Sequence, residues 1–240
     1  MLDVRREGLE EMMNRITFFV TILFAISLFP VELFARAGGG GGGGGGGIGA
    51  AISLPFVLIY LAILHYKLGK KNREALDLLK KVSRIDPMWE KSHLKKRVEK
   101  TFFRVQEAWM ERDQDKIRDC VSERLYRKHK LQTDIMMKNH EKNILSSIDL
   151  IEFFIVELLD FKDDNKDSFW VYIKGSMIDY TINEKTNNVI KGKKDEVETF
   201  TELWKFARSG SEWVLDEIDQ KVQLKDLDRF SSMSEISKTA

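Results

Sequence analysis

The sequence predicts an α+β fold in which helices come first along the chain and a curved antiparallel sheet of about four strands follows. Three observations lead to this prediction. Between residues 69 and 143, apolar residues recur every three or four positions, which is helical periodicity. After residue 147, β-branched and aromatic residues gather in runs that turn residues separate. Helices followed by strands are typical of a layered domain with helices on one face of the sheet.

The N-terminal segment has the composition of an export signal. An apolar run at residues 16–34 follows Arg15 and precedes Ala35-Arg36-Ala37, which is typical of a signal peptide at residues 1–37 that is cleaved after Ala37. Retention of the segment as a first transmembrane helix remains an alternative. The glycines of residues 38–47 have no side chains to bury, so they predict a flexible tether.

A second apolar run, at residues 48–66, contains no Asp, Glu, Lys or Arg and would extend about 28 Å as a helix. This length predicts a transmembrane helix, since the hydrocarbon core of a bilayer is about 30 Å thick. Basic residues follow it directly, which places the C-terminal side in the cytosol. We therefore expect the inner (cytoplasmic) membrane, crossed once after signal cleavage or twice without it, with a cytosolic C-terminal domain.

Residues 67–87 predict a basic amphipathic connector, which ends where Asp86-Pro87 interrupts the helix. Such a helix can lie on anionic lipid or pack on the domain with its lysines in water, and the sequence leaves both open. The residues expected at the membrane surface are Lys67, Lys70, Lys71, Arg73, Lys80 and Lys81. From Lys67 to Arg104 there are thirteen basic and five acidic residues, against thirteen and twenty from Leu145 to Ala240.

Three further helices are expected, at residues 88–112, 115–127 and 131–143, with a restart at Ser122-Glu123 in the second. The single cysteine, Cys120, predicts a buried structural thiol. No metal site or cofactor is expected, because three histidines lie on basic faces that look exposed and lack partners at ligand spacing. These are His93, His129 and His140.

Four strands are expected to form an antiparallel meander that completes a domain over residues 88–223. They are residues 148–162, 168–183, 197–209 and 212–223. Gly175 lies inside the second strand and predicts a bulge or bend. Residues 224–240 are expected to form a flexible tail.

Several short motifs, in this order, resemble the Tim44-like domain family over about residues 95–220. They are FFRVQEAW at 102–109, SERLY at 122–126, SMIDY at 176–180, FTELWKFAR at 200–208 and WVLDEI at 213–218. The resemblance implies an NTF2-like, cystatin-like cone with a pocket between sheet and helices. Mitochondrial relatives are peripheral inner-membrane scaffolds of the presequence translocase that tether a chaperone. This sequence is expected to depart from them by carrying its own membrane anchor in place of a long chaperone-binding region before the domain.

We therefore expect a membrane-anchored, non-enzymatic binding or scaffold module that presents its pocket to lipid, peptide or protein partners. The partners are the bilayer and a membrane or translocation-related protein. Aromatic residues on strands are also ordinary core packing, and that alternative stays open. The candidate pocket residues are Trp170, Tyr172, Asp179, Tyr180, Glu202, Trp204, Arg208 and Trp213.

Two other classes of function remain as alternatives. Related cones include isomerases in which a buried carboxylate acts as a base, and Asp179 and Glu202 are the strand carboxylates available for that role. Against catalysis, Glu202 has Arg208 or Lys205 close by in the motif for a structural ion pair. A ribosome- or RNA-associated adaptor would use the lysine-rich segment 91–100, but nucleic acid is the less favoured partner.

Overall fold

The structure is a computed structural model that describes residues 46–220 and 222–235. The chain divides into two compact units, residues 1–62 and 63–240, and helix α2 (Gly46–Val82) runs across the boundary. The predicted signal at residues 1–37 lies outside the described residues, as does the predicted tether up to residue 45.

The helical half of the second unit is built from two long helices and two short turns. Helix α3 spans Lys91–Glu111 and helix α4 spans Glu123–Lys138. The 3₁₀ turn η2 (Pro87–Trp89) follows α2, where the side chain of Asp86 accepts a hydrogen bond from the Met88 amide at 2.9 Å. The predicted break at Asp86-Pro87 is thus confirmed. The turn η3 (Gln114–Ile117) joins α3 to α4.

The predicted helix start at Ser122 is confirmed, because its hydroxyl caps α4 by accepting a hydrogen bond from the Leu125 amide at 3.2 Å. The predicted division into helices at 115–127 and 131–143 is wrong. One helix covers residues 123–138 without interruption, and residues 141–147 belong to a strand. The chain reverses at His140, whose φ of 56° is a left-handed conformation that stops a helix.

The sheet has five strands in the order β4-β3-β2-β1-β5. They are β1 (Glu141–Asp160), β2 (Ser168–Asn183), β3 (Val189–Ser209), β4 (Glu212–Asp219) and β5 (Met233–Ser234). The first four pair antiparallel as neighbours, so the predicted meander is confirmed. The register of β1 against β2 shifts beside Gly175, between Leu150 and Glu152, where a bulge or bend was expected.

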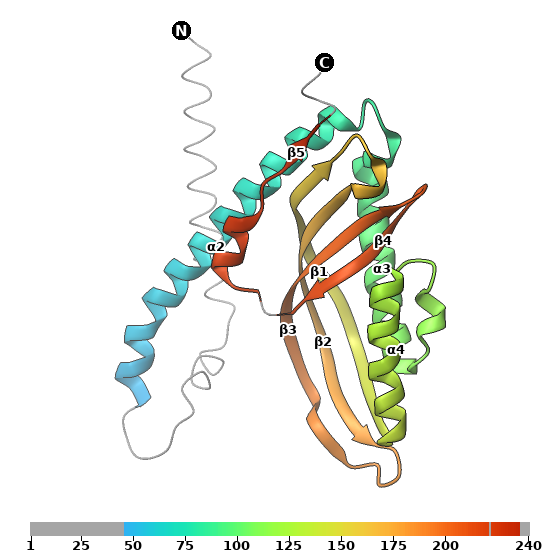
Figure 1. Ribbon diagram of the computed structural model, residues 1–240. Coiled ribbons are helices and arrows are strands. Elements are labelled where there is room, and N and C mark those ends of the chain that lie inside the picture. The colour runs from blue at the N-terminus through green and yellow to red at the C-terminus, as the bar shows by residue number, and fades with distance from the viewer. Residues whose placement is uncertain (1–45, 221, 236–240) are drawn as a thin grey trace. The chain divides into compact units, whose positions relative to one another are not determined.

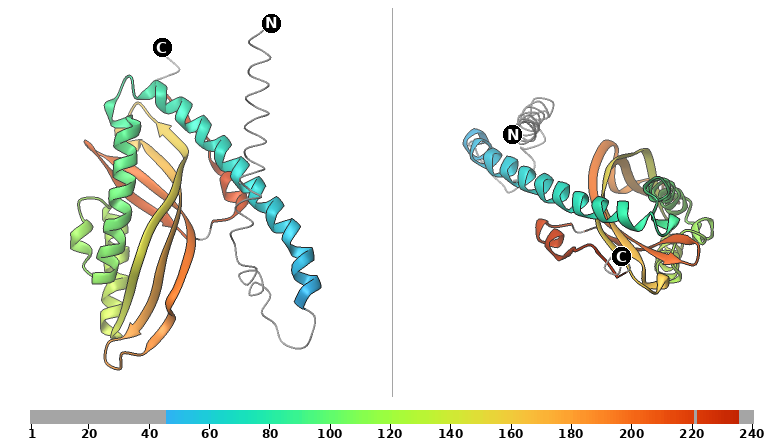
Figure 2. Two further views of the ribbon diagram at one scale, coloured as in Figure 1. Left: turned by 180° about the vertical axis from the view of Figure 1, so that it is seen from behind. Right: turned by 90° about the horizontal axis from the view of Figure 1, so that it is seen from above.

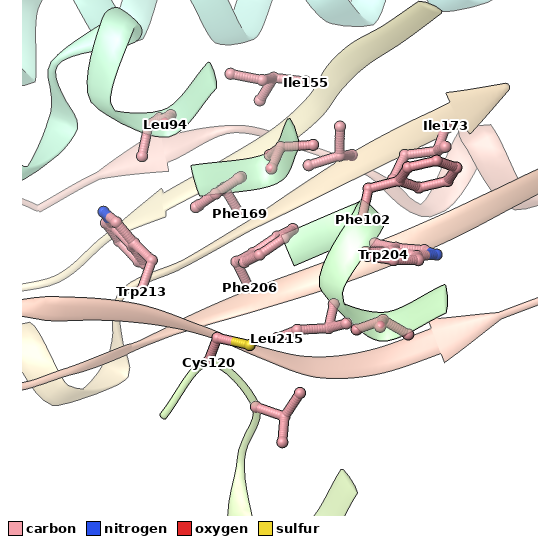
Figure 3. Close-up of a cluster of buried hydrophobic side chains, with 14 of the residues drawn as sticks. Leu94, Phe102, Cys120, Ile155, Phe169, Ile173, Trp204, Phe206, Trp213 and Leu215 are labelled. Atoms are coloured by element: carbon pink, nitrogen blue, oxygen red, sulfur yellow. The ribbon is translucent and has the colours of Figure 1, made fainter. Parts of the chain in front are cut away.

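The long strands curve around α3 and α4, which cover one side of the sheet (Figure 1). We call this side the inner face and the opposite side the outer face. The main core fills part of the inner face, where α3 packs onto the aromatic side chains of β2, β3 and β4. Figure 3 shows Phe169, Phe206 and Trp213 gathered there, and the buried thiol of Cys120, as predicted, at its border.

The part of α2 from Ile63 onward and the C-terminal segment cover part of the outer face (Figure 2). Leu68 of α2 packs there with Tyr172 and Leu203, and with Leu227 and Phe230 from the end of the chain. The residues predicted as a flexible tail instead form the 3₁₀ turn η5 (Leu224–Arg229) and β5, up to residue 234. Leu227 is completely buried, because its apolar side chain fills the gap between α2 and the sheet.

The structure also separates the alternatives for the basic connector. Ala75, Leu79 and Val82 are buried in the main core, so from Ile63 onward α2 packs on the domain and not on lipid along that stripe. Among the described residues, no helix combines the length and the apolar character that crossing a membrane requires. The prediction of a transmembrane helix at residues 48–66 is therefore not confirmed.

Candidate functional site

A cavity of about 650 Å³ lies between the inner face of the sheet and the helices α3 and α4. We call it the inner cavity. Its volume is in the range of sites that hold small organic ligands or a few side chains of a peptide. Its apolar lining comes from both layers: Val105, Trp109 and Met136 from the helices, and Leu145, Met177, Ile190, Phe200, Trp204 and Ile218 from the strands.

The cavity exists because β3 is much longer than its neighbour β4. Strand β4 pairs with β3 only from Leu203 to Ser209, and β3 continues back to Val189 without that neighbour. Gly175 of β2 leaves room for the ring of Phe200, since a Cβ at that position would lie 2.6 Å from Phe200 Cζ. The ring instead stacks on Phe102 of α3, with centroids 6.3 Å apart, and forms one wall of the cavity.

Glu202 is a buried carboxyl group in the cavity wall. One oxygen accepts a hydrogen bond from Trp204 Nε1 at 2.7 Å and the other from Gln220 Nε2 at 2.9 Å. Its side chain is buried, and burial raises the pKa of Glu202 although both hydrogen bonds act in the opposite direction. Among the described residues no cation pairs with it, so the expected ion pair with Arg208 or Lys205 is wrong.

His129 of α4 lies on the opposite wall and is also buried, at 8% exposure. Its expected position on an exposed face is therefore wrong. Burial lowers the pKa of His129 to about 4, which leaves the imidazole neutral at physiological pH. The ring contacts Trp109 edge-on at 5.5 Å between centroids, and its buried Nδ1 has no hydrogen-bond partner.

Among the charged side chains that line the cavity, the acidic ones outnumber the basic ones. Four carboxyl groups line it, against the two ammonium groups of Lys128 and Lys191. Asp179 is exposed and accepts a hydrogen bond from Asn143 Nδ2 at 2.6 Å. The described residues contain no cluster of three or more His, Cys, Asp or Glu that could hold a metal ion.

Comparisons with known proteins place this architecture in a family. The sequence matches the Tim44-like domain over residues 76–220, which is more than half of the chain. The chain belongs to the Tim44-like domain family. A search of curated proteins found no match. Among solved structures, the intermembrane-space region of the chloroplast protein ARC6 matches with 11% identity and a TM-score of 0.38, covering 52% of this chain and 95% of that chain.

Within this Tim44-like domain, three of the predicted pocket residues line the inner cavity: Asp179, Glu202 and Trp204. Trp170 and Tyr172 do not, because they lie on the outer face. The strand register explains the error. Val171 pairs with Trp204 and Tyr172 with Leu203, so neighbouring residues of β2 belong to opposite faces. Tyr180 also lies outside the cavity lining, where Lys194 approaches its ring at 5.9 Å.

The other two predicted pocket residues, Trp213 and Arg208, lie outside the cavity and hold neighbouring turns against the sheet. Trp213 is fully buried, and its Nε1 donates to the Met88 carbonyl at 3.0 Å. Arg208 forms ion pairs with Asp86, Asp164 and Asp167. Burial raises the pKa of Asp167 to about 6 even though Arg208 lowers it. Both residues therefore hold the turn at Pro87 and the β1–β2 loop against the sheet.

Sequence reasoning missed His129, Trp109 and Gln220 as cavity residues. One signal was available: Leu125, His129 and Thr133 recur at four-residue spacing and form the buried stripe of α4. Trp109 follows the buried Val105 of α3 at the same four-residue spacing, although Trp109 itself is only half-buried. Gln220 had no signal, because it follows the last residue of β4 and reaches Glu202 only through the pairing of β3 with β4.

The basic residues expected at the membrane surface fall into two sets. Lys67 pairs with Asp228 at 2.6 Å and Lys71 donates to the Phe230 carbonyl at 2.5 Å, so both hold the C-terminal segment. Lys80 pairs with Asp77 within α2. The side chains of the other three, Lys70, Arg73 and Lys81, are exposed.

Proposed function

We propose that this protein is a membrane-associated, non-enzymatic binding module that holds an apolar ligand or peptide segment in the inner cavity. One observation carries the proposal: a cavity of about 650 Å³, walled by Trp109, Phe200 and Trp204, lies inside a domain whose remaining inner face is filled. A packed interior leaves few voids larger than a water molecule, so a cavity of this size and lining is typical of a binding site.

The polar groups of the cavity support binding over catalysis. Acid–base catalysis on a buried carboxylate requires a partner that positions or relays the proton. Glu202 is instead held by two donors, Trp204 and Gln220, while Asp179 is bonded to Asn143. In the described part of the chain, no hydrogen bond connects Glu202, Asp179 or His129 to one another.

Association with the membrane is proposed from the basic surface of α2 and from the apolar N-terminal sequence. Lys70, Arg73 and Lys81 are exposed, and each basic residue near an anionic surface contributes on the order of 1 kcal/mol. We place the domain on the cytosolic side of the inner (cytoplasmic) membrane, because the basic residues follow the apolar run at 48–66. A reporter fused after Ala240 that proves external would contradict this location.

Filling the inner cavity with a larger side chain tests whether the cavity binds a ligand. The full-length protein in detergent is titrated with an environment-sensitive apolar fluorophore, and Thr181→Trp is compared with Ile182→Trp. Thr181 lines the cavity, whereas its neighbour does not. We expect Thr181→Trp to weaken fluorophore binding at least tenfold and Ile182→Trp to leave it unchanged. Equal binding by both variants and the unmodified protein would refute the assignment.

The membrane part is tested by charge reversal. Replacing Lys70, Arg73 and Lys81 by Glu should reduce flotation of the protein with vesicles containing anionic lipid. Replacing Lys67 and Lys71 should have a smaller effect on flotation, because these two lysines already pair with the C-terminal segment. If neither the triple variant at Lys70, Arg73 and Lys81 nor the double variant at Lys67 and Lys71 changes flotation, the basic surface of α2 does not bind lipid headgroups.

A further inference from the structure

The inner cavity contains a buried negative group for which the described protein supplies no positive partner. Glu202 is 7% exposed, and its two hydrogen-bond donors, Trp204 Nε1 and Gln220 Nε2, are both neutral. A buried carboxylate without a cation is costly, because its Coulombic compensation is missing while its desolvation cost remains. Such a group is normally paired, as Asp167 is paired with Arg208 elsewhere in this domain.

The opposite wall does not neutralise Glu202 either. Lys128 of α4 lines the cavity, but its side chain is exposed, and among the described residues it forms no ion pair with Glu202. His129, the next residue of α4, also lines the cavity, and burial lowers the pKa of its imidazole so that the ring is neutral. Its Nδ1 is buried and has no partner in the described structure. The neutral imidazole therefore contributes no positive charge to offset the carboxylate of Glu202.

The cavity as a whole also favours a positively charged group. Four carboxyl groups line it against two lysines, and the aromatic rings of Trp109, Phe200 and Trp204 form its apolar wall. The face of an aromatic ring attracts a cation, and the attraction is larger where water is excluded. A ligand that fits has an apolar body for these rings and a protonated amine for the carboxylate.

From this arrangement we propose that the inner cavity selects ligands that carry an ammonium group on an apolar body, with Glu202 as the residue that binds the ammonium. This inference rests on the proposed binding function of the cavity and specifies its ligand class. Gln220 and Trp204 are positioning residues, because their hydrogen bonds fix both carboxylate oxygens in the wall.

The probes that test it are 1-octylamine, 1-octanol and octanoate, which share one alkyl chain and differ in head group. Their binding to the full-length protein in zwitterionic nanodiscs is measured by calorimetry at pH 7, where octylamine is protonated. Two variants are compared: Glu202→Gln, and Glu157→Gln as the matched control. Glu157 is also a buried carboxyl group, at 8% exposure, but it lies outside the cavity and accepts from the Ser231 amide.

We expect octylamine to bind at least tenfold more tightly than octanol, and octanoate most weakly. In Glu202→Gln, octylamine should fall to the affinity of octanol, while octanol itself is unchanged. Glu157→Gln should keep the full preference. Each probe partitions into lipid equally for all variants, so the comparison between variants reports the cavity alone.

Two results would overturn the inference, and they differ in what they say of the proposed function. If the three probes bind equally, or octanoate binds best, and Thr181→Trp abolishes this binding, the cavity is a binding site without the proposed selectivity. If none of the probes binds, both the selectivity and the binding function fail. The heat of each probe with empty nanodiscs is subtracted, so the ranking on the unmodified protein reports the protein and needs no variant. A folding defect in Glu202→Gln therefore cannot obscure the outcome.

Discussion

The inner face of the sheet has two halves, although strands β2 and β3 run through both. We call the half that the main core occupies the filled half, and the half that borders the inner cavity the hollow half. In the filled half, Phe169 of β2 stacks on Phe206 of β3 at 4.9 Å and contacts Trp213 edge-on at 5.1 Å. In the hollow half, Glu202 and Phe200 of the same strand β3 border the cavity. Trp204 lies between the halves and belongs to both the core and the cavity lining.

The difference teaches that side-chain alternation alone does not decide whether a face is filled. Residues 198, 200, 202, 204 and 206 of β3 all face inward by strand alternation. In the filled half, β4 pairs with β3, and Trp89 of the turn η2 packs on Trp213 of β4. Strand β4 ends at Asp219, so in the hollow half β3 continues without this neighbour. The length of a neighbouring strand therefore sets where the core stops and the cavity starts.

The two halves should differ most in the stability that is lost when an aromatic residue is truncated to alanine. Phe206→Ala should lower the free energy of unfolding by about 4 kcal/mol, because it leaves a void in a completely buried cluster. Phe200→Ala should cost roughly 1 kcal/mol, since its ring is only partly buried and already borders empty space. Urea unfolding followed by circular dichroism measures both. Equal losses would show that the hollow half is packed in solution.

The next largest difference in stability should appear when one charged residue of each half is replaced by a neutral one. Arg208→Met should destabilise the protein by about 3 kcal/mol, because it leaves the carboxylate of Asp167 buried without its cation. Glu202→Gln should be nearly neutral or stabilising, since it removes a buried charge that has no cation. The same unfolding experiment tests this contrast, and a large loss for Glu202→Gln would mean that a cation already compensates it.

His129, in the hollow half, should make the protein less stable as the pH falls. The pKa of His129 is lowered from 6.5 to about 4 in the folded state, so the unfolded chain binds the proton first as the pH falls. The associated stability, about 3 kcal/mol, should be lost between about pH 6.5 and pH 4, and His129→Gln should remove this loss. Unfolding measured from pH 7 to pH 4.5 tests it.

Asp167, in the filled half, should change the stability of the protein with pH in the opposite direction over much of that range. The pKa of Asp167 is raised from 3.8 to about 6, so the folded state binds the proton first and stability falls as the pH rises from about 4 to 6. Asp167→Asn should remove that decline. If both variants changed the pH profile in the same direction, the assignment of opposite burial effects to the two residues would be wrong.

The smallest expected effect concerns the residue that shapes the cavity wall. Gly175→Ala should cost about 1 kcal/mol, because the new Cβ would press on the ring of Phe200. The displaced ring should enter the cavity and weaken binding of the apolar fluorophore a few-fold. Gly210→Ala is not a suitable control, since Gly210 has a φ of 60°. Gly69→Ala is the control, because nothing lies within 4 Å of a Cβ there.

Much of the fold was predictable because it is encoded locally. Asp86-Pro87, Ser122 and the strand runs act within a few residues, and each produced the expected break, cap or strand. The C-terminal segment was not predictable from its polar composition. Its few apolar residues, Leu227 and Phe230, are buried only because the outer face and α2 come together beneath them.

The candidate site was predictable only in part, for a related reason. Asp179, Glu202 and Trp204 were found because they are polar or aromatic residues in strands. The outer-face residues Trp170 and Tyr172 were grouped with them, since composition does not reveal which strand face is inward. The cavity also depends on α4 lying over the open part of the sheet, which no motif specifies.

The tryptophan side chains provide the most direct test of whether ligand enters the hollow half. The chain has five tryptophans, and their indole N–H signals are separately observable by nuclear magnetic resonance in the ¹⁵N-labelled full-length protein. On addition of octylamine, the signals of Trp109 and Trp204 should shift, whereas those of Trp89 and Trp213 in the filled half and Trp170 on the outer face should not. Shifts at Trp170 alone, or at none of the five, would contradict binding in the inner cavity.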